Sequence, residues 1–180
     1  MDSITLLFAI LSGLIVNGTH GYLLWSQRDE RKWSISTHAA RDRQTHVIYL
    51  IGHLSAGLFF ALFAYRFFVG VHDIEWLFWF SLIGLTFEYT QALLPARGKT
   101  NKAHAVAAYA MFISYTIVVT LAMINLDLSN MTRLFALPFL IAIPVCGIVA
   151  LRKRDKFYFA QMIAISSFSI LSIIYALGSF

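Results

Sequence analysis

Six apolar segments, each about 20 residues long, restrict this chain to very few folds. At 1.5 Å per residue, about 20 helical residues cross the roughly 30 Å hydrocarbon core of a bilayer. The chain has 180 residues, of which 59% are hydrophobic and only 13% charged, and its mean hydropathy is +0.71. This composition lies far from the balance of apolar and charged residues in soluble domains. The sequence therefore predicts an integral membrane protein.

The type of membrane fold follows from the continuity of these segments. Strands of a membrane barrel alternate apolar and polar residues over about ten positions, whereas these segments are apolar throughout. We therefore predict an all-α polytopic bundle of six transmembrane helices, with residues 1 to 180 as a single integral membrane domain. The expected helices cover residues 4 to 25, 46 to 68, 74 to 94, 104 to 126, 132 to 151 and 157 to 179.

The basic residues indicate the direction of the helices. All of the 14 Lys and Arg residues except Arg66 and Arg133 lie in the first, third and fifth connections. Cytoplasmic loops carry the excess of Lys and Arg, so we expect these connections in the cytoplasm and both termini outside. Topology and anionic headgroups then explain the net charge of +5, and we expect no nucleic acid partner. In the absence of an organelle signal, we expect the cytoplasmic membrane of a bacterium or archaeon.

The first connection, between Ser26 and Thr45, is the longest. The stretch WSISTHAARDRQTH within it is compatible with two structures. It can begin a helix capped by Ser34 or Ser36, with Trp33 and Ile35 at the depth of the lipid headgroups. It is equally compatible with a solvated loop.

Polar residues interrupt the apolar segments at a similar depth near the cytoplasmic ends of the helices. Counted along each helix, His20, His53 and Glu88 lie roughly 7 to 12 Å inside the membrane core. An ionised carboxylate that faces lipid at this depth costs several kcal/mol, so we expect these side chains to face one another. The predicted ligand or proton site contains Glu88, His53, His20, Gln91, His104 and Asn17.

The chemistry of this site favours transport or binding over catalysis. We expect Glu88 to be the central ionisable group of a pocket that faces the cytoplasm, with His53 and His20 as its partners. A carboxylate and an imidazole in contact can exchange a proton near neutral pH. This favours proton- or ion-linked transport, or the binding of a small molecule or lipid. A homo-oligomer, or an accessory subunit of a larger membrane complex, is also compatible with so small a chain.

A membrane redox enzyme or metalloenzyme is the alternative. Haem b would need two histidines at equal depth on different helices, as His20 and His53 are. Zinc would need three or four donors, for which His20, His53, His104 and Glu88 are candidates, although no HxxxH or HExxH pair is present. No nucleophile elbow or phosphate-binding loop is visible either. We therefore favour a protein that is not an enzyme and has no cofactor.

One hairpin has a family resemblance. The stretch LLPARGKTNKAHAVAAYAMF, residues 93 to 112, resembles a pattern in six-helix membrane proteins of unknown function with DRAM-like and Sfk-like architecture. In that pattern an apolar helix ends in a turn with proline and glycine, here Pro95 and Gly98. A histidine, here His104, then opens a helix rich in small residues. The resemblance implies six helices and a hairpin between the third and fourth of them, and it implies no activity.

Overall fold

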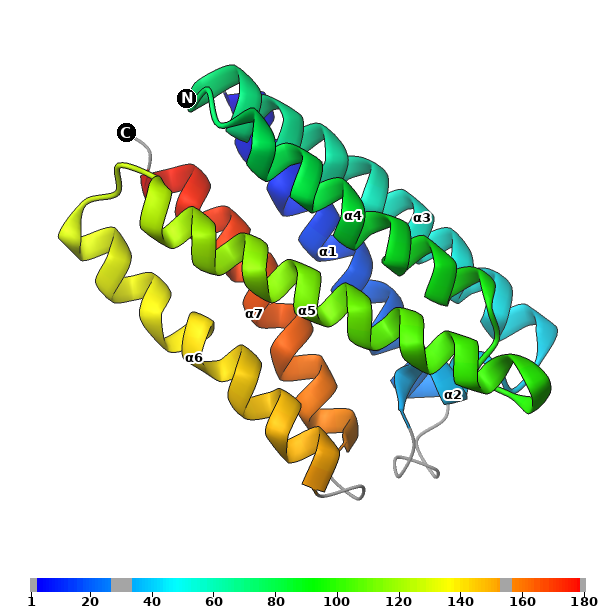
Figure 1. Cartoon of the computed structure of the whole chain (residues 1–180). Coiled ribbons are helices and arrows are strands. Elements are labelled where there is room, and N and C mark those ends of the chain that lie inside the picture. The colour runs from blue at the N-terminus through cyan, green and yellow to red at the C-terminus, as the bar shows by residue number, and fades with distance from the viewer. Residues whose placement is uncertain (1–2, 27–33, 153–156, 179–180) are drawn as a thin grey trace.

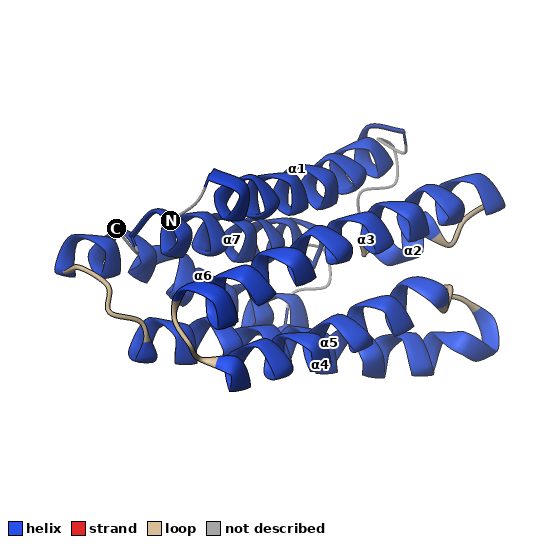
Figure 2. Ribbon diagram, turned by 90° about the horizontal axis from the view of Figure 1, so that it is seen from above, coloured by secondary structure: helices blue, strands red, loops and turns tan. Residues whose placement is uncertain are grey.

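The computed structural model describes residues 3 to 26, 34 to 152 and 157 to 178, and all regular secondary structure in these ranges is helical (Figure 1, Figure 2). This confirms the predicted all-α class. The long helices are α1 (Ser3–Ser26), α3 (Arg43–Ala64), α4 (Glu75–Leu93), α5 (Asn101–Asn125), α6 (Asn130–Arg152) and α7 (Phe157–Gly178). The short ones are α2 (Ile35–Ala39), the π-helix η2 (Tyr65–Val71) and the 3-10 helix η3 (Gly98–Thr100).

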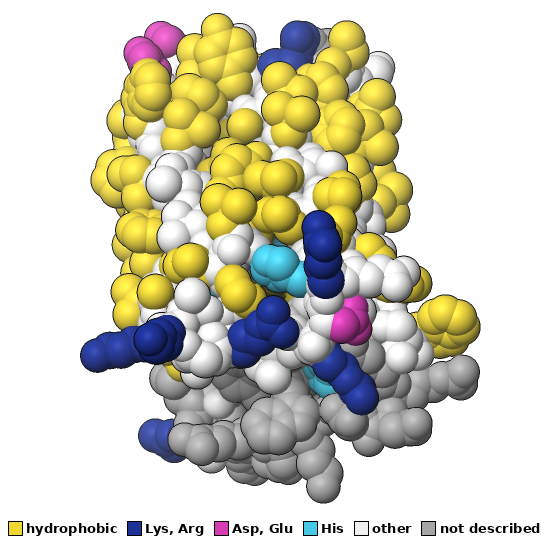
Figure 3. Space-filling view, turned by 90° about the vertical axis from the view of Figure 1, so that its right-hand side faces the viewer, with side chains coloured by type: hydrophobic (Ala, Val, Ile, Leu, Met, Phe, Trp, Pro, Cys, Tyr) yellow, Lys and Arg dark blue, Asp and Glu magenta, His cyan; other side chains and the backbone are white. Residues whose placement is uncertain are grey.

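Five helical segments in the described residues are long and apolar enough to cross a membrane, as expected for a multi-pass membrane protein. They are Ser3–Ser26, Arg43–Val71, Gly98–Asn125, Asn130–Ala150 and Phe159–Gly178. The helix α4 is not among them, because Glu75, Glu88 and Gln91 lower its mean hydropathy. In Figure 3, apolar side chains cover much of the surface toward one end, and most of the Lys and Arg side chains gather toward the other.

The six long helices run back and forth along one axis (Figure 1). The helix α3 packs between α1 and α4, and α5 packs mainly on α4, whereas the hairpin of α6 and α7 joins the other helices mainly through contacts of α7 with α1. Ser3 and Gly178 lie at the same end of the bundle, which we call the terminal end. The helix α2 and the turn between α4 and α5 lie at the opposite end, which we call the α2 end.

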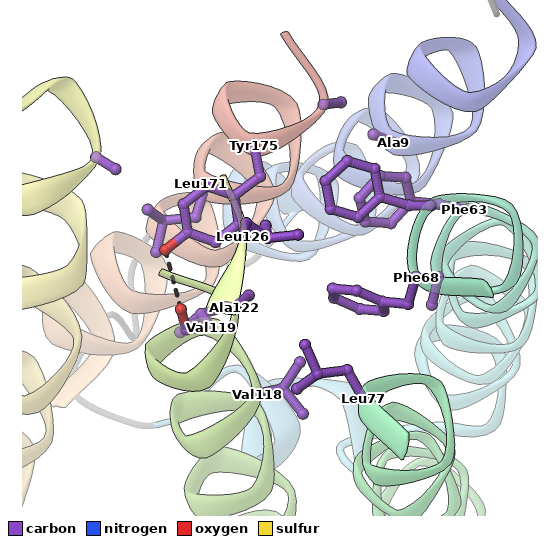
Figure 4. Packing of buried hydrophobic residues seen from close by; sticks show 14 of the residues in the cluster. Ala9, Phe63, Phe68, Leu77, Val118, Val119, Ala122, Leu126, Leu171 and Tyr175 are labelled. Atoms are coloured by element: carbon purple, nitrogen blue, oxygen red, sulfur yellow. Dashed lines mark hydrogen bonds between the residues drawn. The ribbon is translucent and has the colours of Figure 1, made fainter. Parts of the chain in front are cut away.

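Apolar packing differs between these two ends. The terminal half has the larger core, to which Phe63 of α3, Leu77 of α4 and Val118 of α5 contribute (Figure 4). There the Tyr175 hydroxyl of α7 donates to the Val119 carbonyl of α5 at 2.9 Å. The α2 half has a smaller core cluster, which consists of Leu23, Ile35, Ala39, Tyr49 and Ala92. His20, His53 and Glu88 lie on their helices between these two apolar clusters.

The first connection contains a helix, α2, and its position differs from the expected one. Ser34 caps α2, because its hydroxyl accepts a hydrogen bond from the Thr37 backbone N–H at 3.2 Å. Ile35, however, is 0% exposed and packs in the smaller core cluster, so its side chain contacts other helices instead of lipid headgroups. An apolar side chain gains more from burial between helices than from the partly hydrated headgroup layer. Trp33 lies outside the described residues.

The start of α3 and the turn before α5 are built by local polar contacts. Asp42 caps α3 and accepts a hydrogen bond from the Thr45 backbone N–H at 2.8 Å. This bond stabilises the carboxylate and holds the pKa of Asp42 below its usual value. Before α5, Gly98 has a φ of 56°, a left-handed conformation that glycine adopts without strain. The Thr100 hydroxyl donates to the Pro95 carbonyl at 2.6 Å and closes this turn.

Candidate functional site

Two histidines from different helices meet inside the bundle. His20 of α1 and His53 of α3 are 1% and 4% exposed, and their Nε2 atoms are 3.0 Å apart. This is a hydrogen-bond distance, so one nitrogen carries the hydrogen and the other accepts it. The Nδ1 atom of His20 is buried and has no hydrogen-bond partner among the described residues. In the histidine pair, His20 Nδ1 is therefore the atom that can still form a hydrogen bond.

The other side of the pair continues to Glu88 of α4. The distance from His53 Nδ1 to Glu88 Oε1 is 2.8 Å, and Glu88 is 7% exposed. The second carboxylate oxygen, Oε2, accepts a hydrogen bond from the Tyr115 hydroxyl of α5 at 2.6 Å. These contacts join four side chains from α1, α3, α4 and α5 into one chain of hydrogen bonds. We call His20, His53, Glu88 and Tyr115 the buried polar chain.

Gln91 and His104 belong to a separate set of contacts closer to the α2 end. The Tyr49 hydroxyl of α3 donates to Gln91 Oε1 at 2.7 Å. His104 Nδ1 of α5 lies 2.8 Å from the Gln91 carbonyl oxygen and 2.7 Å from that of Leu94. His104 therefore donates to carbonyls at the C-terminal end of α4, where a helix has carbonyls without intrahelical partners. It supports the α4–α5 turn and is not joined to Glu88 by these bonds.

Asn17 points toward α7 instead of the buried polar chain. Its Nδ2 donates to the Gly13 carbonyl at 2.8 Å and to the Ser169 hydroxyl at 3.1 Å, and its Oδ1 accepts from the Ser166 hydroxyl at 2.8 Å. Side-chain amides and hydroxyls commonly hold membrane helices together in this way. Asn17 was predicted to line the site, and in the structure its hydrogen bonds link α1 to α7.

Two tyrosines complete the site and were not predicted from the sequence. Tyr49 lies one turn before His53 on α3, and its ring centroid is 4.3 Å from that of His53. Tyr115 lies three turns after His104 on α5, and its hydroxyl reaches Glu88. A tyrosine inside a membrane helix carries a hydroxyl that needs a partner. Helical spacing from the predicted histidines was the signal that could have identified both residues.

The geometry does not fit a haem between His20 and His53. The iron of a bis-histidine haem lies between the two ring nitrogens, whereas the Nε2 atoms here are in hydrogen-bond contact at 3.0 Å. A zinc site is not formed either, because the described residues contain no group of three or more His, Cys, Asp or Glu side chains placed to hold a metal ion. His104, one of the candidate ligands, is bonded to the end of α4. The arrangement is suited instead to holding and passing a proton.

Comparisons of the chain with protein-family models, curated proteins and solved structures found no match. The function is therefore inferred from the residues of the buried polar chain and their geometry.

Proposed function

We propose that this protein is a six-helix integral membrane protein that binds and relays a proton through His20, His53, Glu88 and Tyr115. The observation that supports this proposal is the continuous series of hydrogen bonds between these four side chains, three of which are at most 7% exposed. Each ring nitrogen of His53 contacts a different neighbour. His53 can therefore accept a proton on one side and release one on the other.

The possible proton positions follow from the donors and acceptors. Tyr115 donates to Glu88, and an ionised Glu88 also accepts from His53 Nδ1–H. With neutral histidines, His20 Nε2–H then donates to His53 Nε2. If His53 gains a proton, it donates from both nitrogens, and His20 must carry its own hydrogen on Nδ1. The buried polar chain thus passes a proton between His20 and His53 when the hydrogen bond between their Nε2 atoms reverses its direction.

The negative charge of Glu88 favours the binding of one extra proton by the buried polar chain. Without it, an ionised Glu88 is a single negative charge in a buried site, which costs several kcal/mol in hydrocarbon surroundings. With it, the site contains either a carboxylate beside an imidazolium or a protonated carboxyl group, and its net charge is zero.

Movement of the proton changes contacts between four helices, which is a direct way to couple protonation to transport. In our proposal the cargo is an ion, a small molecule or a lipid. We also propose that α4 crosses the membrane in addition to the five apolar segments. Both chain ends then lie outside, and the membrane is the cytoplasmic membrane of a bacterium or archaeon. At 19 residues α4 is about 28 Å long, close to the thickness of the hydrocarbon core.

Proton binding can be tested by ¹⁵N NMR of the six histidines in protein reconstituted in lipid nanodiscs. We expect the ring nitrogens of His20 and His53 to titrate together, because they share one hydrogen. Glu88→Gln keeps the shape of the side chain and removes its charge, so the histidine pair should bind the extra proton more weakly than in the wild type. The matched control is Glu75→Gln, which changes an exposed carboxylate on the same helix and should leave proton binding unchanged.

Proton relay can be tested in liposomes that contain a pH-sensitive dye, with an imposed potassium diffusion potential. The wild type and Glu75→Gln should conduct protons, and Glu88→Gln should fall to the level of empty liposomes. Equal proton flux through the wild type and Glu88→Gln would contradict the relay. Independent titration of His20 and His53, unaffected by Glu88→Gln, would contradict the shared proton.

A further inference from the structure

The smaller core cluster separates the buried polar chain from the α2 end of the bundle. Ile35 and Ala39 of α2 are 0% and 1% exposed, and they pack with Leu23 of α1, Tyr49 of α3 and Ala92 of α4. Leu23 lies one turn after His20, Tyr49 one turn before His53, and Ala92 one turn after Glu88. The helix α2 therefore occupies the position where the path from the histidines to this end of the bundle would run.

A polar groove of about 370 Å³ lies beyond this cluster, between the end of α1 and the start of α3. It is lined by Tyr22, Ser26, Arg41, Asp42, Gln44 and Thr45. Thr45 is buried, and it lies on the same side of α3 as Tyr49 and His53. Along α3, the distance from Thr45 to His53 is roughly 12 Å. Polar groups thus approach the site from the α2 end and are interrupted by the apolar cluster.

The barrier toward the terminal end is much thicker. Along α1, the distance from His20 to Ser3 is roughly 25 Å, and the larger core fills this half of the bundle. The shortest route for water to His20 and His53 along these helices is therefore on the α2 side. The smaller core cluster stands in that route, beside the contacts of Gln91 and His104 at the end of α4.

The helix α2 depends on its neighbours to stay folded. It has five residues, and a helix of that length is not stable by itself. The Ile35 backbone N–H donates to Gln161 Oε1 of α7 at 3.1 Å, and the Thr45 hydroxyl donates to the Ala39 carbonyl at 3.0 Å. Because its own hydrogen bonds are too few to keep it folded, α2 stays in place only while these contacts hold.

We propose that α2 is a movable plug that closes the path between the buried polar chain and the α2 end of the bundle. Gln161 of α7 is the clasp, because its side chain accepts the hydrogen bond from Ile35 that fastens this plug to α7. Departure of α2 removes Ile35 and Ala39 from the apolar cluster and connects the polar groove with His20 and His53. This inference rests on the proposed function, because a plug controls access to a proton site only if the site binds protons.

The plug can be tested by cysteine labelling in lipid nanodiscs with a charged thiol reagent. Cys146 is the one cysteine of the chain, so Cys146→Ser gives a clean background. Ala92→Cys places a reporter behind α2 at a position that is 0% exposed. We expect slow labelling that becomes about fivefold faster when Gln161→Ala removes the clasp, the effect of losing one typical hydrogen bond. Ser34→Ala, which removes the N-terminal cap of α2, should also accelerate labelling.

Matched controls separate local opening from general loosening. Ser172→Ala removes a hydroxyl that bonds to the Phe168 carbonyl within α7, and it should leave the labelling rate unchanged. A reporter at Ala9, 2% exposed in the larger core, should stay unlabelled in every background. The plug is refuted if neither Gln161→Ala nor Ser34→Ala accelerates labelling at position 92. It is also refuted if labelling at position 9 rises in parallel. Neither result depends on the histidine titration, so the plug and the proton site can fail separately.

Discussion

Glu88 is the residue on which the buried polar chain depends most, because each of its carboxylate oxygens has a different partner. Oε1 lies 2.8 Å from His53 Nδ1, and Oε2 lies 2.6 Å from the Tyr115 hydroxyl oxygen. Hydrogen bonds to a charged group are shorter and stronger than those between neutral groups. Tyr115 therefore holds the carboxylate in the orientation that faces His53.

Tyr115→Phe tests this contribution at the scale of one residue. It removes the hydroxyl and leaves Glu88 Oε2 without this donor, so we expect the free energy of unfolding to fall by about 1.5–3 kcal/mol. Chemical denaturation in detergent micelles would measure the change. Tyr109→Phe on the same helix is the control, because Tyr109 is 50% exposed, and it should change stability little. Equal stability of the two variants would show that the Tyr115–Glu88 bond does not stabilise the fold.

At the scale of helices, close packing of α4 on α5 brings Tyr115 to Glu88. Gly84, one turn before Glu88 on α4, makes this approach possible. A Cβ atom at this position would be 2.7 Å from Cδ1 and from Cε1 of Tyr115, which is closer than packed carbon atoms come. Glycine is needed here because the ring of Tyr115 occupies the space of a side chain.

Gly84→Ala should therefore separate the two helices and weaken the Tyr115–Glu88 bond. We expect a net loss of about 1–3 kcal/mol, the usual cost of overpacking, although alanine is the better helix former. Gly18→Ala on α1 is the matched control, because a Cβ there meets no atom within 4 Å, and it should be neutral or slightly stabilising. Thermal unfolding in nanodiscs would compare the two variants. If both behave alike, close packing at Gly84 is not required.

At the scale of the whole molecule, the position of α4 decides the topology. It packs between α3 and α5 and contains Glu88, although its composition is the least typical of a membrane crossing. A polar residue inside a membrane helix is tolerated where it faces other helices instead of lipid, as Glu88 does. This is the physical reason why we propose α4 as a crossing although its hydropathy is lower.

Reporter fusions in bacterial cells would test the sixth crossing. Alkaline phosphatase is active only outside the cytoplasm, so we expect activity for a fusion after Phe180 and none for a fusion at Gly98. If α4 does not cross, the turn at Gly98 lies outside and the second fusion becomes active. That result would refute the six-helix topology while leaving the contacts of the buried polar chain unchanged.

The sequence predicted the helices well and the contacts between them less well. Helix ranges follow from long apolar runs, so the structure has a helix in each of the six expected places, for example α5 at Asn101–Asn125 where 104 to 126 was expected. The contact of His20, His53 and Glu88 was anticipated from their similar depth. Depth does not specify which neighbour a side chain faces, and Asn17 therefore turned out to bond with Ser166 and Ser169 of α7.

The sequence by itself determined the all-α class, the apolar helices and the positions of the buried histidines and Glu88 along them, because hydrophobicity and helical rise act along the chain. Only the tertiary structure decided that Tyr115 completes the buried polar chain, that His104 bonds to the end of α4, and that α2 is buried beneath the histidines. Each of these depends on how a helix is rotated about its axis and which helix packs beside it. Packing between segments distant in the chain sets that rotation, and no local pattern of residues encodes it.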